Sequence, residues 1–287
     1  MANEYLSGLN LDELMVNTKA ATVYAAQEQS LYLSGGIVPM VNVPAGSITA
    51  QVPVMGKVIA TTISAEADST SGIGDLVPQA VSDAQNHISL ELVAARSVVR
   101  DLGGVSPQEI GRILGNAVAT KVDTMVTAAM GGLTAQEKAG TGGAGSDLTM
   151  ADIFEAVATI RGTGEGGELF GIVSTSTYAG LMEAIGGSAF AGGDFQTSAM
   201  RNGFFGKIAG VNLFISSYLN DTTIPGAVVN PKAAIFSGDA MRGAISGGVN
   251  LEIERRASAV GFDVVASAAF GCATIDATRG VLIVDAA

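Results

Sequence analysis

The stretch Ser106–Gly132, SPQEIGRILGNAVATKVDTMVTAAMGG, decides the fold, because it predicts one long α-helix around which the rest of the chain is arranged. Its apolar residues recur at spacings of three and four, which puts them on one face of a helix: Ile110, Ile113, Leu114, Ala117, Val118, Val122, Met125, Val126, Ala129 and Met130. The polar residues Arg112, Asn116, Lys121 and Asp123 are expected on the opposite, solvated side. We call this predicted element the spine helix.

Both ends of the spine helix carry sequence signals. Ser106 is expected as the N-cap, with Pro107 at the first helical position and Glu109 completing a capping box. The pair Gly131-Gly132 is expected to end the helix, because a glycine adopts the left-handed conformation of a C-terminal cap at little cost.

The composition is poor in charge and rich in small residues. Of 287 residues, 38 are glycine, 15% are charged, 5% are aromatic and none is tryptophan. Because large uncharged surfaces usually mark interfaces, this composition suggests a subunit that covers much of its surface with copies of itself.

The charge balance argues against several classes of partner. With 15 basic and 27 acidic residues the net charge is −12, whereas nucleic-acid binding needs clustered cations. The adjacent pair Arg255-Arg256 is expected on a solvated strand edge. The uncharged stretch between Glu28 and Lys57 is cut by prolines into pieces too short to span a membrane as a helix. The single cysteine, Cys272, excludes an internal disulfide.

The chain before the spine helix predicts an arm followed by a hairpin. Residues 1–30 are expected to form an N-terminal arm with a helix around Leu11–Gln29. Ser47–Ile63 alternates and is rich in β-branched residues, which is typical of a strand, and Pro53 confines it to an edge. Ala65–Asp83 is a polar, glycine-containing connection, and His87–Val99, with Ile88, Leu90, Leu92 and Ala94 in alternation, predicts the returning strand.

The chain after the spine helix predicts mixed helices and strands. Thr134–Asp147 is glycine-rich and is expected to be a linker. A capped helix should begin at Thr149 with Asp152 at its third position, bury Ile153, Phe154, Val157 and Ile160, and end at Gly162. The remaining expected elements are a strand at Leu169–Ser174, a helix at Thr175–Ile185 ended by Gly186-Gly187, a loop over 186–206, a turn at Pro225-Gly226, and strands at Val211–Ser217, Ala233–Phe236, Val249–Arg256, Phe262–Ser267 and Gly280–Val284. Without strict alternation of strand and helix, the fold class is α+β.

The sequence offers no constellation of residues for catalysis. His87 is the only histidine and Cys272 the only cysteine, so a metal site with nitrogen or sulfur ligands and a Ser-His-acid set are both disfavoured. Glu252 and Glu254 share one strand face, where a solvated edge is the simpler role. The dinucleotide pattern occurs at Gly140/Gly142/Gly145 and at Gly162/Gly164/Gly167, but neither follows a strand and opens a helix. We therefore predict no catalytic, cofactor-binding or metal-binding residues.

Several stretches, in order, resemble the major capsid proteins of tailed bacteriophages, and short-tailed phages in particular. They are AQVPVMGK (50–57), SDAQNHISLELVAARSVV (82–99), FGIVSTSTYAGL (170–181), GKIAGVNLFISSYL (206–219) and AIFSGDA (234–240). No one of them is specific, but their order and spacing together cover the chain from about residue 45 to its end. The resemblance implies the Hong Kong 97-like fold.

This resemblance also implies a division of the chain into parts. Residues 1–45 would be the N-terminal arm and 46–95 an extended hairpin loop. Residues 96–147 and 249–287 would form a peripheral domain with the spine helix, and 148–248 an axial domain. The family's scaffolding segment is not expected ahead of the arm, and no crosslinking residues can be matched.

The function that the resemblance implies is that of a major capsid protein rather than an enzyme. It would assemble with itself as pentamers and hexamers into an icosahedral virion shell, formed in the host cytoplasm, around DNA that it does not read by sequence. Scaffolding, portal and decoration proteins are the further partners implied, and no membrane or cofactor is. Two alternatives stay open: the shell protein of an encapsulin-like cellular compartment, and, from another class, a glycine-rich nucleotide-binding enzyme.

Overall fold

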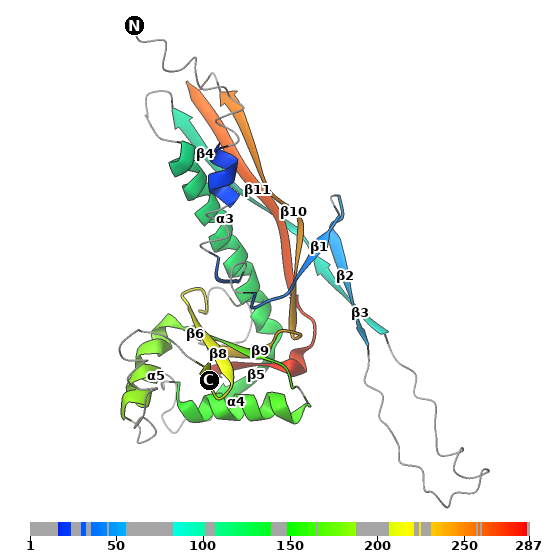
Figure 1. The fold of residues 1–287 in the computed structure, drawn as a ribbon, viewed down its shortest axis with the longest axis vertical. Coiled ribbons are helices and arrows are strands. Elements are labelled where there is room, and N and C mark those ends of the chain that lie inside the picture. Colours follow the sequence, from blue (N-terminus) through cyan, green and yellow to red (C-terminus); the bar gives the residue numbers. More distant parts are fainter. Residues whose placement is uncertain are drawn as a thin grey trace, which may run out of the picture.

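The computed structural model describes residues 17–23, 30–32, 36–44, 46–55, 83–100, 107–138, 148–164, 166–187, 207–220, 224, 231–256, 258 and 260–285. Within these ranges the strands form three sheets, with orders β1-β10-β11-β4, β5-β12-β9-β6-β8-β7 and β2-β3. Figure 1 shows an elongated body in which the spine helix lies along the four-stranded sheet, the six-stranded sheet lies at one end, and the two-stranded hairpin stands away.

The elements have the following bounds. The four-stranded sheet contains β1 (Met40–Val43), β10 (Met241–Arg256), β11 (Gly261–Thr274) and β4 (Glu91–Arg100). The six-stranded sheet contains β5 (Thr134–Lys138), β12 (Gly280–Asp285), β9 (Pro231–Ser237), β6 (Leu169–Ser174), β8 (Val211–Ser216) and β7 (Lys207–Ile208). The hairpin is β2 (Thr49–Met55) with β3 (Asp83–Ser89), and the helices are α3 (Pro107–Ala129), α4 (Met150–Gly162), α5 (Thr175–Gly187) and the 3₁₀ turns η1 (Met130–Gly132) and η4 (Ala277–Arg279).

The spine helix α3 packs one apolar row against the four-stranded sheet. The fully buried members recur at every fourth residue: Ile110, Leu114, Val118, Val122, Val126 and Met130. They share a core with Val93 of β4, Leu251 of β10 and Val264 and Phe270 of β11. The predicted stripe was too wide, because Ile113 is 56% exposed and Ala117 is also exposed, while Met125 and Ala129 are half-buried. The four-stranded sheet thus buries one row of α3 fully and its flanking residues only in part.

A second row of α3 is buried by the N-terminal part of the chain. Gly111, Gly115, Ala119, Asp123 and Thr127 are all buried, one position round the helix from the apolar row. Residues 17–23 are helical and approach Gly111 so closely that a β-carbon there would lie 2.7 Å from the Thr18 carbonyl oxygen. Asp123 was predicted on the solvated side, and this is wrong, because residues 30–32 cover it. Arg112 and Lys121 are exposed as expected, and Asn116 is half-buried.

The described residues between 17 and 43, which we call the N-terminal strap, belong to the core. Tyr32, Ile37 and Val38 are each at most 1% exposed and pack in the α3 core. The strap then joins the four-stranded sheet, since β1 pairs in parallel with β10 from Met40↔Gly243 to Val43↔Ser246. The expected helix around Leu11–Gln29 is confirmed for residues 17–23 and elsewhere lies outside the described residues.

The six-stranded sheet is covered on both faces, which explains its nearly continuous apolar strands. In β12 the side chains alternate: Leu282 and Val284 pack in the α3 core, whereas Val281 and Ile283 pack in a second core with α4 and α5. The N-terminal end of α4 has the predicted capping box between Thr149 and Asp152. Phe154 was predicted to be buried, but it is 44% exposed, because the buried row of α4 is Ile153, Ala156 and Ile160.

The predicted returning strand is two strands. β3 and β4 are interrupted at Leu90, where β3 pairs with β2 and β4 pairs with β11. The interruption reverses the alternation: Ile88 and Leu90 are buried, but Leu92 is 75% exposed and Val93 is buried instead. Pro53 lies opposite Gln85 in the two-stranded hairpin, where both strands are edges.

The predicted start of the spine helix is confirmed, whereas its predicted C-terminal cap is wrong. The helix begins at Pro107 as predicted, and Ser106 lies outside the described residues. At the other end the glycines do not adopt the left-handed conformation; the helix passes into the 3₁₀ turn η1. Gly131 and Gly132 permit close approach instead, since β-carbons there would lie 2.7 Å from Ile224 Cγ2 and 2.8 Å from Thr274 Oγ1.

Several predicted elements are confirmed with changed bounds. The strands of residues 169–174, 211–216, 231–237 and 280–285 are present, as is the helix from Thr175, while β10 and β11 are longer than predicted. The start of the predicted linker at Thr134 is wrong, because Thr134–Lys138 forms β5 in parallel with β12. The hairpin connection up to Ser82, the loop over 188–206 and the Pro225-Gly226 turn lie outside the described residues.

The α+β class is confirmed. The division into four parts stays a prediction, and it has to accommodate β5 and β12, which hydrogen bond within the same sheet as β6 and β9. Among the described helices, none combines the length and the apolar character needed to cross a membrane.

Candidate functional site

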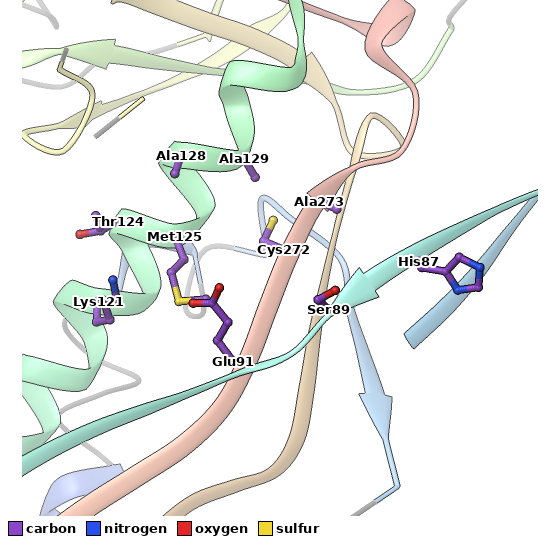
Figure 2. Close-up of a pocket in the computed structure, with 10 residues that line it drawn as sticks. All are labelled: His87, Ser89, Glu91, Lys121, Thr124, Met125, Ala128, Ala129, Cys272 and Ala273. Carbon is purple, nitrogen blue, oxygen red and sulfur yellow. The ribbon is translucent and has the colours of Figure 1, made fainter. Parts of the chain in front are cut away.

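A groove of about 800 Å³ lies between the spine helix and the point where β3 and β4 meet. His87 and Cys272, the only histidine and the only cysteine of the sequence, both line this groove (Figure 2). The lining residues are His87, Ser89, Glu91, Lys121, Thr124, Met125, Ala128, Ala129, Cys272 and Ala273.

The chemistry of this groove does not support catalysis. Burial raises the pKa of the Cys272 thiol to about 12, so the thiolate needed for nucleophilic attack is scarce at neutral pH. Figure 2 shows the His87 ring on β3 pointing away from Cys272. Within the described ranges, no group of three or more His, Cys, Asp or Glu residues could hold a metal ion.

The other residues considered from the sequence are surface groups. Glu252 and Glu254 are exposed on the part of β10 beyond its pairing with β1, as expected for a solvated edge. Arg255 and Arg256 are exposed there too, with the Arg255 guanidinium 5.3 Å from the centre of the Phe262 ring. Gly162 ends α4 and Gly164 precedes β6, so that glycine pattern stands between helix and strand, and Gly140, Gly142 and Gly145 lie outside the described residues.

The surfaces that suggest a role are apolar and uncovered. On the face of the four-stranded sheet away from α3, Leu92 is 75% exposed and Val98 is 40% exposed. They flank Ala94 and the ion pair of Arg96 with Asp263. Across the described part of the molecule the exposed large apolar residues are Ile48, Leu92, Val98, Ile113, Phe154, Ile215 and Val260.

A buried polar junction joins the N-terminal strap to the spine helix. The Asp123 carboxylate accepts hydrogen bonds from Ser30 Oγ at 2.5 Å and from the Leu31 backbone N–H at 3.2 Å. One turn further along α3, the Tyr32 hydroxyl lies 3.2 Å from Thr127 Oγ1. Burial raises the pKa of Asp123, and burial likewise raises that of Tyr32.

The sequence analysis missed this junction, although a signal for it exists. Gly111, Gly115, Ala119, Asp123 and Thr127 recur at every fourth residue, which makes a row of small and polar side chains next to the apolar row. Such a row indicates a second packing partner at close range, and the N-terminal strap is that partner.

Comparison with known proteins identifies the fold through solved structures and not through sequence. No protein-family model matches the sequence, and no curated protein matches it. The structure of the chain resembles the capsid of the cyanophage P-SCSP1u, with a TM-score of 0.62 and 15% identity over 87% of this chain and 86% of that one. It resembles a chain of Mycobacterium phage Che8 with a TM-score of 0.61 and 17% identity, over 88% of each chain. A virus-like particle from Pyrococcus furiosus gives a TM-score of 0.64 and 11% identity, over 94% of this chain and 99% of that one.

These likenesses cover most of each chain and hold at low identity, so they establish the architecture. The chain has the Hong Kong 97-like fold of capsid proteins, which the order of the short motifs in the sequence predicted. The groove beside the spine helix and the uncovered face of the four-stranded sheet are surfaces of that fold.

Proposed function

We propose that this protein is the major capsid protein of a tailed bacteriophage, a subunit that assembles into the icosahedral shell enclosing the genome. The observation that carries the proposal is the fold, matched over 87% of the chain to the capsid of a cyanophage. A fold by itself does not fix a function, so the surfaces of this chain have to support the assignment as well.

The surface properties support a self-assembling subunit. Leu92, Val98 and Phe154 place large apolar side chains in solvent in the single chain. Only 15% of the residues are charged, and exposed apolar patches on a soluble subunit usually mark interaction sites. Contacts with other copies, arranged as pentamers and hexamers, would bury these residues.

The proposal includes partners and a location. The shell encloses DNA without reading its sequence, and a net charge of −12 makes tight contact with the phosphates unfavourable. Scaffolding, portal and decoration proteins are its further partners, assembly takes place in the host cytoplasm, and the mature protein resides in the virion. Residues 96–147 and 249–287 would serve as the peripheral domain and 148–248 as the axial domain.

Electron microscopy of the purified protein tests the proposal directly. We expect closed, roughly spherical particles or capsomers, and sedimentation well beyond the 28.8 kDa of one chain. A protein that sediments only as that single chain at every salt and crowding condition would contradict the assignment. A variant in which Leu92 is replaced by Asp should fold, because Leu92 is 75% exposed, yet it should assemble less well if the sheet face is an interface.

The shell of a cellular compartment is the second candidate, because one structure with this fold is described as a virus-like particle and not as a phage capsid. The virus-like particle from Pyrococcus furiosus matches over 94% of this chain with a TM-score of 0.64. The content of particles isolated from the native source separates the two: nuclease-protected DNA supports the phage capsid, and co-purified protein cargo supports the compartment.

We infer a structural and not an enzymatic role. The nucleotide-binding alternative rested on glycine patterns, one of which stands between α4 and β6 and so lacks the strand that must precede a phosphate-binding turn. Titration with ATP and NAD by calorimetry should give no binding heat; saturable binding would revive the enzyme hypothesis.

A further inference from the structure

The Asp123 carboxylate is buried in an unusual setting for an acid. The residue is 4% exposed, and the carboxylate accepts hydrogen bonds from Ser30 Oγ and the Leu31 backbone N–H, with a further contribution from the Tyr32 backbone N–H. None of these donors is a cation, and no ion pair of Asp123 occurs among the described residues. A buried carboxylate without a cation is costly as an anion.

The titratable groups buried around Asp123 are neutral near pH 7, and the one nearby cation of α3, Lys121, is exposed. From the strap, Tyr32 faces it, with a pKa raised by burial. From β11, Cys272 lies near Tyr32, and burial raises the pKa of its thiol to about 12. On α3 itself, Lys121 is exposed in the groove of Figure 2, and Thr127 is not titratable. Asp123 is therefore the group of this junction that changes charge as the pH falls from neutral.

The hydrogen-bond partners can serve both forms of the carboxyl group. The Ser30 hydroxyl donates to the anion, and by rotating it can accept a hydrogen bond from the neutral acid. The Leu31 N–H still finds a carbonyl-like oxygen in the neutral form. Burial outweighs these hydrogen bonds, so the pKa of Asp123 in the docked strap lies above that of an exposed aspartate.

We propose that Asp123 and residues 30–32 form a proton-coupled latch, in which docking of the N-terminal strap on α3 takes up a proton and tightens as the pH falls. The sign follows from linkage. The docked state binds the proton more readily than the open state, so docking is strongest below the ordinary range of an exposed aspartate, near pH 4, and weakens as the pH rises through the raised value of the docked state. This inference concerns the single subunit and does not depend on the proposed function.

Opening of the strap would affect three parts of the subunit. The same segment covers Gly111 on α3, buries Tyr32 in the α3 core, and continues into β1. Loosening at Asp123 would therefore uncover the row of small residues on the spine helix and leave the apolar row in place against the sheet.

Hydrogen exchange measured by mass spectrometry tests the latch in the full-length subunit. The readout is the protection of backbone amides in the peptide that contains Leu31 and Tyr32, between about pH 4 and about pH 7. Each wild-type value is divided by that of Asp123→Asn, which keeps the shape and cannot ionise; like the neutral acid, its oxygen can accept from the Leu31 N–H while its other end donates to Ser30 Oγ. We expect this ratio to fall with rising pH by up to about tenfold per pH unit over the window, and then to level off. A ratio that is flat or that rises with pH would overturn the proposal.

Two further variants provide a control and an independent test of the latch. Glu109→Gln removes an exposed carboxylate from the same helix and should leave the wild-type profile unchanged. Ser30→Ala removes the donor that favours the anion, so the loss of protection should extend to higher pH. This second test needs no Asn variant and holds even if Asp123→Asn fails to fold. An unshifted Ser30→Ala profile would likewise count against the latch.

Discussion

Val118 lies in the middle of the apolar row of α3 and is 2% exposed. Replacing it with Asp would place an unpaired charge against the four-stranded sheet, which costs about 3–5 kcal/mol or more, a large part of a domain's stability. We expect Val118→Asp to yield no soluble folded subunit. Arg112→Ala is the matched surface change on the same helix, because Arg112 is exposed and pairs with the exposed Glu109.

Circular dichroism distinguishes the two variants. Arg112→Ala should melt within a few degrees of the parent, while Val118→Asp should lack the cooperative transition. If both melt like the parent, the orientation of the spine helix is wrong.

Gly111 tests the close contact between the strap and α3. In the middle of a helix, Gly→Ala usually stabilises by about 1 kcal/mol. Here the added β-carbon would lie 2.7 Å from the Thr18 carbonyl oxygen and 2.8 Å from the Ala21 β-carbon, so the strap helix would have to move. We expect Gly111→Ala to leave α3 folded but to increase proteolysis within residues 17–23.

Gly162, the last residue of α4, supplies the control for this substitution. No atom lies within 4 Å of the β-carbon that Ala would add there, so Gly162→Ala should leave the proteolysis pattern as in the parent. Equal protease resistance in both variants would mean that the strap does not need the close approach at Gly111.

At the scale of elements, β4 and β11 are joined by a cross-strand ion pair. Arg96 Nε donates to the two Asp263 carboxylate oxygens at 2.7 and 2.9 Å, and the Arg96 guanidinium makes a further contact. These hydrogen bonds from Arg96 lower the pKa of Asp263. A lowered carboxyl pKa contributes stability that is present above the ordinary value and is lost as the pH falls through the lowered one.

Arg96→Gln should therefore destabilise the subunit most at neutral pH. We expect the difference in melting temperature from the parent to shrink as the pH falls through the lowered pKa of Asp263, and to disappear once Asp263 is protonated. Lys207→Gln, the same change of charge at an exposed position of β7, should show no such narrowing. A difference that stays constant with pH would mean that the Arg96–Asp263 pair contributes no net stability.

The elements that could be predicted from the sequence are those specified by nearby residues. The start of α3 at Pro107, the capping box of Thr149 with Asp152, and the apolar strand of β12 all follow from local spacing. Local signals suffice there because each element contains its own start signal or its own pattern of burial.

The features that could not be predicted depend on distant partners. The interruption at Leu90 arises because β3 and β4 pair with different strands, which the alternation of one segment cannot reveal. Thr134–Lys138 forms a strand because β12 lies beside it. Asp123 is buried because residues 30–32, far away in sequence, cover it. The exposed sheet face around Leu92 could not be predicted for the same reason. Leu92 is exposed because the alternation of buried and exposed residues reverses at Leu90, where the pairing partner changes.

At the scale of the molecule, the architecture leaves one face of the four-stranded sheet without a partner in the single chain. α3 and the strap cover the inner face of the four-stranded sheet, and the opposite face retains Leu92 and Val98 in solvent. The hairpin of β2 and β3 projects from the body (Figure 1), but Ala50 and Ile88 of the hairpin pack against Ala244 of β10, so the sheet supports it. We propose that contacts with further copies cover this sheet face and engage the hairpin connection.

The hairpin connection offers the sharpest test of that idea. Residues 65–82 are rich in Gly, Ser, Thr and acidic residues, which bury little apolar surface, so replacing them with a short Gly-Ser turn should leave the subunit folded. The described pairing from Thr49↔Ser89 to Met55↔Asp83 would be retained. If the connection clasps a neighbouring subunit, as we propose, the shortened protein should remain as capsomers or single chains.

A Gly-Ser segment of the original length is the matched control, because it keeps the reach of the hairpin and removes its side chains. Failure of both variants to close shells would mean that the side chains of residues 65–82 make the contact. Failure of the short variant alone would assign the effect to reach. Closed shells of normal size and stability from the short variant, seen by electron microscopy, would show that the hairpin is a plain surface loop. Assembly would then rest on the exposed sheet face around Leu92 and Val98.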